Sequence, residues 1–483
     1  MTRPTMPNDY PPGSFTDRVP DALDAAVLAD LSAAGVAHDV SADARAQHGR
    51  DWWPLSLRDV HEGRVPYWPG AVVRPSTTAQ VCATMRVASA HRIAVTAQGG
   101  RSSVVGGAVA PSGALALDLT GLNRVVDVDT VSGTVSVEAG VFGPDLETAV
   151  NRRGLTVGHF PQSFALSTVG GWLACRGAGQ YSNRYGKIED MVRSLSVVLA
   201  NGELVELGSR APRQAVGPDL MQLFVGSEGT LGIITRATLV ARQRARYESR
   251  AAYGFESFVE GLEACRRVLQ RGAQPAVLRL YDERESQRNF AVATCALIVL
   301  DEGDPALVEA TMHIVHEECA SGAALEASHV ATWLEHRNDV SALAALWERD
   351  IVVDTIEIAG PWALLASLYD EVTHALASLA ATSVVSVHQS HAYVDGACLY
   401  FTFAGRPDGN IEQYYRDAWD VATRAALRSG GVLSHHHGVG RSRARFVREA
   451  LGSAYDVLHT LKETLDPLNI MNPGVLGVGA PPW

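Results

Sequence analysis

The chain contains 483 residues, of which 47% are hydrophobic, so it is long enough for two or more domains and apolar enough for a sizeable core. Its formal net charge of −12 disfavours nucleic acid as a partner, because binding a phosphate backbone requires a basic face. A local cluster of arginines can still bind a small anion against this overall charge.

The remaining bulk features favour a reduced, cytoplasmic protein. No apolar run approaches the length needed to cross a bilayer, and the first fifteen residues, MTRPTMPNDYPPGSF, lack an apolar signal core and predict a disordered tail. The six cysteines form no CxxC pair, which favours buried thiols. A transient contact with a membrane surface and a homodimer are both compatible with these features.

The first half of the chain begins with a helix and continues as a β-rich region. Residues 21–34 carry apolar side chains at helical spacing, and loops follow up to Pro75. A helix is predicted over 78–91, because Ser76-Thr77-Thr78 supplies an N-terminal signal. Short strands separated by turn residues are predicted at 71–74, 94–97, 115–117, 125–128 and 135–137.

Residues 242–250, with the sequence RQRARYESR, are polar and charged and predict a linker between two domains. Beyond them, two similar strand–helix units predict a separate α+β domain that caps the first. The predicted helices are 255–271, 306–320, 363–381 and 411–429, and the predicted strands are 276–281, 293–300, 383–390 and 399–403.

Three glycine-rich loops punctuate the β-rich region, at 96–107, 160–192 and 224–239. The first, TAQGGRSSVVGG, is neither a GxGxxG turn opening a helix nor a Walker loop, since no lysine follows its glycines. Its backbone N–H groups can converge on an anion, although a tight cluster of β-turns is an equal alternative. Three such loops together favour a large, flat, phosphate-bearing cofactor, because glycine permits close backbone approach.

Five separated motifs, in the same order along the chain, resemble the FAD-binding domain of the vanillyl-alcohol-oxidase type, also called the PCMH type. They are Gly99-Gly100-Arg101-Ser102-Ser103, Ser167-Thr168-Val169-Gly170-Gly171-Trp172, Asn183-Arg184-Tyr185-Gly186, Gly226-Ser227-Glu228-Gly229-Thr230-Leu231-Gly232, and Asp466-Pro467 with Asn472-Pro473-Gly474. The resemblance implies an α+β fold with a two-subdomain PCMH-type FAD-binding domain over 60–241 and an α+β cap or substrate domain over 242–425. An N-terminal tail and helix occupy 1–59, and a C-terminal segment, 426–483, returns to complete the flavin site.

The same resemblance implies FAD as the cofactor. The first loop and the region of Ser167 would hold the pyrophosphate, residues 228–234 the adenine and ribose side, and Asn183 and Tyr185 would lie near the flavin. Some members attach FAD through a histidine in the first loop, but Arg101 stands there, next to the expected pyrophosphate, so we expect non-covalent FAD. The predicted cofactor-binding residues are Gln98, Gly99, Gly100, Arg101, Ser102, Ser103, Pro161, Ser167, Thr168, Gly171, Ala178, Asn183, Tyr185, Glu228, Gly229, Gly232 and Ile234.

Three consecutive histidines, His435-His436-His437, lie between two glycine turns and are followed by Arg443. They fit a structural cluster, a metal site, or an acid–base and anion-binding cluster. On a β-like segment His435 and His437 share a face and His436 opposes them.

The resemblance disfavours the hypothesis that the histidines bind a metal. Family members that oxidise D-2-hydroxy acids carry a His/His/Glu metal triad. In this chain His391 matches the first histidine, but Tyr400 stands in place of the second histidine and His436 in place of the glutamate. This leaves too few ligands for a transition metal, and we predict none.

The segments SHHHGVG and GACLYF resemble alkylglycerone-phosphate synthases, also called alkyldihydroxyacetonephosphate synthases, as do Arg279 in PAVLRLYD and Arg349-Asp350 followed by Glu357 and Pro361-Trp362. Those enzymes exchange the acyl chain of acyl-dihydroxyacetone phosphate for a fatty alcohol through a flavin N5 adduct, without net redox change. The resemblance implies a phosphorylated or lipid-like small-molecule substrate and ether-lipid biosynthesis.

The catalytic residues predicted on this basis centre on Tyr400 as the base. A tyrosine pKa near 10 is too high for a base at neutral pH, so an adjacent cationic histidine is expected to lower it. Arginine offers paired donors for the carbonyl or phosphate oxygens of the substrate. The predicted catalytic residues are Tyr400, His436, His437, Arg349 and Arg279, and the predicted substrate-binding residues are His435, Arg443 and His391.

Two alternatives remain open at this point. The first is an ordinary flavin oxidase or dehydrogenase acting on a hydroxy acid or a secondary metabolite, and the second is a flavin-bearing binding protein without catalysis. The cap region matches the synthases less well than the FAD domain does, and a homologue can keep its flavin site yet act on another substrate.

Overall fold

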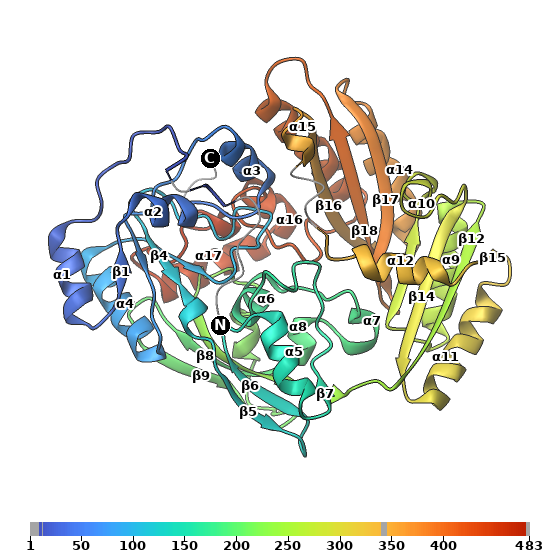
Figure 1. Cartoon of the computed structure of the whole chain (residues 1–483), viewed down its shortest axis with the longest axis horizontal. Helices are drawn as coiled ribbons and strands as arrows, with labels where there is room; N and C mark the ends of the chain where they lie inside the picture. The colour runs from blue at the N-terminus through green and yellow to red at the C-terminus, as the bar shows by residue number, and fades with distance from the viewer. Residues whose placement is uncertain (1–8, 12, 340–344, 480–483) are drawn as a thin grey trace.

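The computed structural model describes residues 9–11, 13–339 and 345–479. The chain forms two halves side by side (Figure 1). One half contains the helices and strands up to β11 together with the C-terminal helices, and the other contains β12 to α15. Within the described ranges, none of the helices combines the length and hydropathy that spanning a bilayer requires.

The N-terminal region is more ordered than the sequence predicts. It forms α1 (Ala25–Ala33), β1 (His38–Asp39), α2 (Ala42–His48) and α3 (Pro54–His61), and the last two occupy a stretch predicted as loops. Tyr10 is 4% exposed and its hydroxyl donates to the carbonyl oxygen of Arg64 at 2.5 Å. The prediction of a disordered tail is therefore wrong for residues 9–11 and 13–15, and its other residues lie outside the described ranges.

The first sheet has the order β1-β2-β4-β3, in which β2 (Ala71–Val73), β4 (Leu115–Asp118) and β3 (Val95–Gln98) run parallel. Helix α4 (Thr78–His91) connects β2 to β3, with the bounds that the sequence predicts. The Thr77 hydroxyl oxygen accepts a hydrogen bond from the backbone N–H of Gln80, which caps the helix.

The second sheet is antiparallel, with the order β5-β6-β10-β8-β9. Its strands are β5 (Val125–Asp129), β6 (Thr134–Glu138), β10 (Ile233–Val240), β8 (Val192–Val198) and β9 (Leu204–Gly208). Between β6 and β8 the chain forms α5 (Gly143–Asn151), β7 (Leu155–Thr156), α6 (Val169–Cys175), α7 (Ser182–Tyr185) and α8 (Ile188–Met191). Two of the three glycine-rich loops thus approach this sheet, and the first follows β3.

The predicted linker at 242–250 is largely strand. β11 (Arg242–Gln243) pairs with β7, and β12 (Tyr247–Phe255) pairs with β14 (Cys295–Gly303) from Tyr247 onward. The polar composition reflects exposure of these strands, not lack of structure, and the chain crosses between the two halves over 244–246.

The second half is a seven-stranded sheet of order β15-β12-β14-β13-β17-β18-β16. The orders β12-β14-β13 and β16-β18-β17 repeat the same pattern, in agreement with the two similar units predicted. Its other strands are β13 (Val277–Tyr281), β15 (Ala323–Leu325), β16 (Val352–Pro361), β17 (Thr382–Ala392) and β18 (Gly396–Gly405). The helices are α9 (Phe258–Gln270), α10 (Glu283–Phe290), α11 (Pro305–Glu318), α12 (Ser328–His336), α14 (Trp362–Ala377) and α15 (Ile411–Arg428).

Alternation along the strands decides which side chains enter the core of this half. On β18, Leu399, Phe401 and Phe403 join the apolar cluster formed with α9, α11, α14 and α15. Because successive side chains point to opposite faces of a sheet, Tyr400 lies on the face away from these helices.

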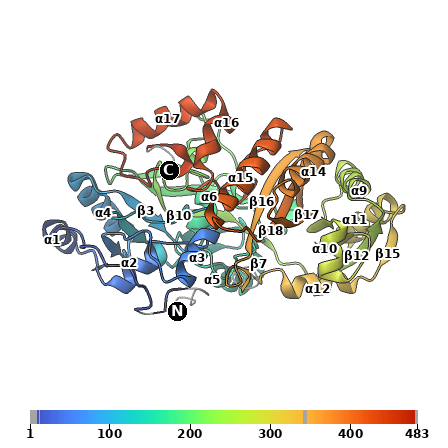
Figure 2. The ribbon, with the colours of Figure 1, turned by 90° about the horizontal axis from the view of Figure 1, so that it is seen from above.

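The C-terminal segment returns to the first half, as predicted. α16 (Val447–Leu451) and α17 (Ala454–Leu465) lie over that half in Figure 2. The backbone N–H of Val95 on β3 donates to the Ile470 carbonyl, and Asn472 N–H donates to the Val95 carbonyl. The segment that carries the histidines lies between the two halves, because the His437 N–H donates to Glu357 of the second half and the Val439 N–H donates to Glu228 of the first.

Candidate active site

Three polar residues lie opposite one another on adjacent strands of the seven-stranded sheet. His388 on β17 and Glu357 on β16 are both register partners of Tyr400 on β18. The His388 and Tyr400 rings stack with centroids 4.8 Å apart, and the Tyr400 hydroxyl lies 3.0 Å from the Thr355 hydroxyl. This polar row is on the face directed at the first half of the molecule.

Glu357 holds the histidine run against this row. Its carboxylate is fully buried and accepts hydrogen bonds from the Ser434 hydroxyl at 2.6 Å and from the His437 backbone N–H at 3.0 Å. Arg443 donates to both carboxylate oxygens, at 2.9 and 2.6 Å. Burial alone would raise the pKa of Glu357, but Arg443 and His437 hold it well below its usual value.

Arg443 therefore differs from the prediction. Its side chain is fully buried, its terminal nitrogens are committed to Glu357, and its guanidinium lies 4.6 Å from the centroid of the Trp419 ring. It is placed to position the histidine loop and not to bind a substrate oxygen.

The three rings of the run do not alternate. The segment forms bends, and the Nδ1 atoms of His435 and His436 lie 2.9 Å apart. Both rings pack on His391, with centroids 5.0 and 4.9 Å from it. The expectation that His436 opposes the other two is wrong, because the backbone here is not extended.

The His437 ring lies between Tyr400 and Glu357. Its Nε2 lies 3.4 Å from the Tyr400 hydroxyl, and its Nδ1 lies 3.1 Å from a carboxylate oxygen of Glu357, a close contact without hydrogen-bond geometry. A hydroxyl, an imidazole and a buried carboxylate in this order are the arrangement by which an enzyme moves a proton from a weakly acidic hydroxyl.

The electrostatics of Tyr400 contradict one expectation. Burial raises the pKa of the phenol, and the charge on Glu357 raises it further, against the lowering effect of the Thr355 hydrogen bond. Burial also lowers the pKa of His436 well below 6.5, so no cation is available from that ring. Tyr400 is protonated at neutral pH and loses its proton only if His437 accepts it.

His391, His435 and His436 each present one ring nitrogen, and these atoms lie within 4.8 Å of one another. The Nδ1 atom of His391 is bonded to the Ser182 hydroxyl at 2.8 Å, and Nε2 of His435 to the Tyr393 hydroxyl at 2.8 Å. Burial lowers the pKa of His435 to about 4 and that of His391 well below its usual value, so both are neutral near pH 7. We predicted no metal from the loss of two ligands without counting His435, which lies close enough to His391 and His436 to be a third nitrogen ligand.

Of the predicted arginines, Arg279 lies beside the row. Its Nη2 is 2.5 Å from Nε2 of His388, and its Nε donates to the Tyr281 hydroxyl at 2.8 Å. Burial and the nearby Arg279 lower the pKa of His388 to about 4. A neutral His388 that accepts from Arg279 carries its proton on Nδ1, which lies 2.7 Å from the Glu285 carboxylate.

Arg349 is not brought to this cluster. Its side chain is exposed and the residue precedes β16, where its backbone carbonyl accepts from Arg406 at 2.7 Å. The structure thus gives no contact between Arg349 and the predicted catalytic residues.

Sequence reasoning assigned no role to Glu357, His388 or Glu285. An acidic residue within VVDTIEIAG and a histidine within VVSVHQS interrupt apolar strands, and a charge there requires a buried partner. That interruption was the available signal, but it does not identify the partner.

The first predicted cofactor loop makes its side-chain contacts mainly with the N-terminal region. The Oε1 atom of Gln98 lies 2.5 Å from Nδ1 of His48, and the Nε2 group of Gln98 donates to the Ala108 carbonyl at 2.6 Å. Arg101, with φ +58°, donates to the Gln47 carbonyl and to Asp9, contrary to the expectation that it faces a pyrophosphate. Ser103 accepts from the N–H of Gly107 at 3.2 Å, and Ser102 is half-buried.

Two glycines of this loop are required by packing within the protein. A Cβ at Gly100 would lie 1.7 Å from the Leu166 carbonyl oxygen, and one at Gly99 would lie 2.1 Å from the Thr168 hydroxyl. Gly171, in contrast, is exposed, and the nearest atom to its Cβ position is 3.5 Å away. Gly99 and Gly100 are therefore needed because another loop packs closely against them, whereas a side chain at position 171 would meet no close neighbour.

The second loop is held by its own contacts. Ser167 accepts from the Trp172 indole N–H at 2.7 Å and donates to the Ser163 carbonyl, and Thr168 caps α6. Ala178 is buried and Pro161 is half-buried.

Helix α7 carries two predicted flavin contacts in different directions. The side-chain oxygen of Asn183 accepts from the Ala392 N–H at 3.1 Å, next to His391. The Tyr185 hydroxyl instead donates to Glu302 of β14 at 2.5 Å, and the Tyr185 ring packs in the core. Tyr185 is thus a contact between the two halves and is not directed at the histidine cluster.

The third loop connects to the histidine run. Glu228, with φ +49°, accepts from the backbone N–H groups of Val439 and Gly440 at 2.7 and 2.8 Å. Burial raises the pKa of Glu228 to about 7. Gly229 has φ +74° and open space around its Cβ position, whereas Gly232 and Ile234 are packed in the core.

A bound cofactor fits the groups that remain available here. Within the described part of the chain, the Asn183 side-chain nitrogen, next to His391, is buried without a hydrogen-bond partner. Together with the uncrowded backbone at Gly171 and Gly229, it offers a donor and accessible main chain to a polar, flat ligand.

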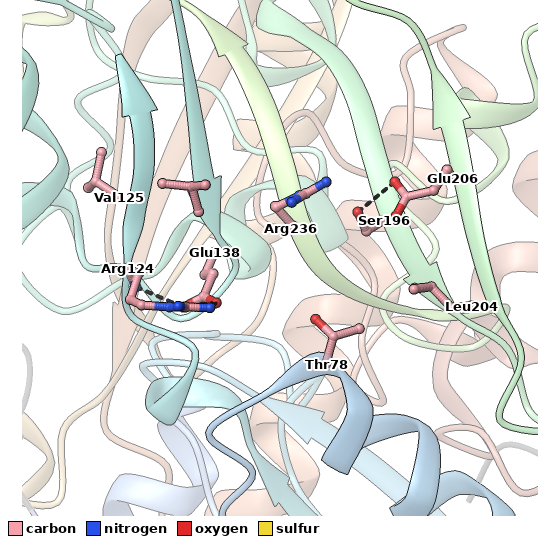
Figure 3. A pocket seen from close by; sticks show the side chains of 9 residues that line it. Thr78, Arg124, Val125, Glu138, Ser196, Leu204, Glu206 and Arg236 are labelled. Carbon is pink, nitrogen blue, oxygen red and sulfur yellow. Dashed lines mark hydrogen bonds and ion pairs between the residues drawn. The ribbon is translucent and has the colours of Figure 1, made fainter.

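A cavity of about 460 Å³ lies elsewhere, against the second sheet. Figure 3 shows Arg236 between the Arg124–Glu138 pair and the Ser196–Glu206 pair, with Thr78 of α4 at the rim. Its charges largely balance, and it contains none of the predicted site residues.

Comparison with known proteins shows similarity to FAD-linked enzymes over most of the chain. The family described as "FAD binding domain" matches residues 69–208, and "FAD linked oxidases, C-terminal domain" matches 244–476. The chain is 30% identical over 441 residues to the uncharacterized FAD-linked oxidoreductase YgcU of Escherichia coli K12, covering 86% of this chain and 91% of that protein.

It is also 30% identical to the alkyldihydroxyacetonephosphate synthase of Dictyostelium discoideum, covering 86% of this chain and 75% of that one. It is 26% identical to glycolate oxidase subunit GlcD of Bacillus subtilis, with coverages of 87% and 94%. A solved structure of an alkyldihydroxyacetonephosphate synthase superposes with a TM-score of 0.80 at 26% identity, covering 95% of this chain and 87% of that chain.

Proposed function

The chain belongs to the family of FAD-linked oxidases, and we propose that this flavoenzyme exchanges an acyl group for a fatty alcohol on a ketone phosphate, as an alkylglycerone-phosphate synthase does. The observation that carries the proposal is the placement of the His437 ring between the Tyr400 hydroxyl, at 3.4 Å, and the Glu357 carboxylate, at 3.1 Å, beside the predicted flavin site. The likeness to synthases in both sequence and structure supports it.

FAD, when bound, supplies an electron-accepting ring; the chain's own residues would move protons around it. Tyr400 would take the proton from the carbon next to the ketone while its own proton passes to Nε2 of His437. Glu357, 3.1 Å from Nδ1, would stabilise the imidazolium that forms. Arg279, half-buried beside His388, is the predicted arginine best placed to hold a carbonyl or phosphate oxygen.

The reaction balances without an oxidant. The carbon–oxygen bond of the ester breaks and a carboxylic acid leaves, an alcohol oxygen forms the new ether bond, and the proton taken from carbon returns at the end. Binding of FAD without a covalent bond is part of the proposal, since the first loop has arginine at position 101 and no His, Cys or Tyr. Acid precipitation of the protein should then release the flavin into the supernatant.

The direct test incubates the purified yellow protein anaerobically with acyl-dihydroxyacetone phosphate and a fatty alcohol, and measures ether product and released fatty acid by mass spectrometry. Tyr400→Phe should retain FAD and lose at least a hundredfold in rate, whereas Tyr247→Phe, at a side chain 39% exposed, should match the wild type. Full activity of Tyr400→Phe would contradict the assignment.

A dehydrogenase or oxidase acting on a hydroxy acid is the second candidate. The three neutral imidazoles of His391, His435 and His436 within 4.8 Å favour it, as does the likeness to glycolate oxidase subunit GlcD. Bleaching of the flavin by glycolate or D-lactate under anaerobic conditions, with no ether product, would select this reaction instead.

A further inference from the structure

A second cavity, of about 800 Å³, lies where the two halves meet and is lined by arginines. Arg242, Arg244 and Arg246 come from the connection between the halves, Arg184 from α7 and Arg271 from the end of α9. Figure 1 shows this connection leaving the region of β7 toward the side of the sheet that carries α11. This concentration of positive charge contrasts with the net charge of −12.

Three of these guanidinium groups are available to an anion. Arg184 pairs with Asp301, and Arg271 pairs with Glu317 and Glu318. In the described ranges no ion pair involves Arg242, Arg244 or Arg246, all of which are exposed; Arg242 makes a long hydrogen bond, 3.4 Å, to the Tyr185 carbonyl.

The backbone fixes the position of these side chains. Arg242 pairs with Thr156, and the N–H of Arg244 donates to the Gly154 carbonyl at 3.0 Å. All five residues from Arg242 to Arg246 line the cavity, so the three arginines share one space. Repulsion among three unpaired cations costs energy that a bound anion would relieve.

The opposite wall is largely apolar, although Asp304 and Thr311 also line it. The Asp304 carboxylate caps α11 by accepting from the Ala306 N–H at 3.0 Å. Leu307, Ala310 and Ile314 are spaced along one face of α11, and Leu307 is 61% exposed. A ligand that fits both walls carries a phosphate group and an aliphatic chain, because guanidinium groups match phosphate oxygens and the helix face matches hydrocarbon.

We propose that this cavity binds the phosphate group of an amphiphilic phosphate ester, at a site separate from the Tyr400 cluster. The site and that cluster lie on different sides of α7: Ser182 bonds to His391, whereas Arg184 lines the cavity and pairs with the buried Asp301. The inference does not depend on the exchange reaction, since its evidence is the arginine segment and α11. The phosphate group can belong to a free molecule or to a lipid in a bilayer, and two arms of one experiment distinguish these sources.

The experiment uses the FAD-loaded protein. One arm titrates decyl phosphate below its micellar concentration by calorimetry, with inorganic phosphate and decanol as comparisons. The other measures co-sedimentation with vesicles of phosphatidylcholine containing phosphatidic acid, against phosphatidylcholine alone. The test variant is Arg244→Gln/Arg246→Gln, and the matched control is Arg152→Gln/Arg153→Gln, which removes the same charge from exposed positions of the first half.

Saturable binding of decyl phosphate, weakened at least tenfold in the test variant and unchanged in the control, would support a free ligand. Binding only to phosphatidic acid vesicles, with the same dependence on Arg244 and Arg246, would support a lipid headgroup. The proposal is overturned if neither probe binds, or if both double variants weaken binding equally, because general charge then explains the effect. Retention of flavin absorbance in all variants confirms that they are folded.

Discussion

Replacing Glu357 by glutamine tests whether a buried ion pair positions the histidine loop. The carboxylate accepts two hydrogen bonds from Arg443 at 2.9 and 2.6 Å, one from Ser434 at 2.6 Å and one from the His437 backbone at 3.0 Å. Glutamine keeps the shape but places an NH₂ group against one of the Arg443 donors. Both original side chains are fully buried, so the Arg443 charge loses its directly paired carboxylate and keeps only the weaker interaction with Asp354.

Breaking a buried pair from one side costs about 3–5 kcal/mol, mainly through the uncompensated charge. In a domain of about 150–250 residues, each kcal/mol of lost stability lowers the melting temperature by about 2–4 °C. Glu357→Gln should therefore melt roughly 6–20 °C below the wild type. Thermal unfolding followed by circular dichroism, together with flavin release, measures this. The double variant Glu357→Gln/Arg443→Gln should recover part of the loss, since it removes the unpaired cation.

The matched control is Glu412→Gln, which breaks the Glu412–Arg416 pair on α15. That pair is 2.8 Å long, but its side chains are 50% and 33% exposed, so water screens it and the loss should stay below about 1 kcal/mol. If Glu357→Gln melts like this control, or if the double variant is less stable than the single one, the account of Glu357 as the anchor of the loop is incorrect.

Two further outcomes are expected. Gly100→Ala should destabilise the fold by about 1–3 kcal/mol, because its Cβ would lie 1.7 Å from a carbonyl oxygen. Gly171→Ala should keep the stability of the apoprotein and weaken FAD binding. Equal melting temperatures for the two variant apoproteins would contradict this expectation. The pKa of His435 is about 4 in the folded protein and near 6.5 in the unfolded chain. The stabilising effect of the neutral His435 is therefore present above pH 6.5 and is lost as the pH falls toward 4. The loss of folding free energy is on the order of 2 kcal/mol by pH 5. His435→Gln should therefore reduce the difference in melting temperature between pH 7.5 and pH 5, and the exposed His313→Gln should not. A parallel decline in all three proteins would argue against a neutral, half-buried His435.

Local signals were sufficient where a segment's neighbours in sequence determine its structure. The helix over Thr78–His91 was predictable because Thr77 caps it and its apolar residues recur at helical spacing. The same reasoning failed at RQRARYESR, because an exposed strand and a linker have similar composition and only pairing with β7 and β14 separates them.

The sequence by itself determined the family motifs, their order, the cofactor they imply and the candidate residues Tyr400, His436 and His437. Only the tertiary structure decided which partners these groups have. Strand register places Glu357 and His388 on either side of Tyr400, and a long-range contact assigns Arg443 to Glu357. The protonation of a side chain depends on its burial and on charges brought from distant segments, so it is fixed by packing and not by spacing along the chain.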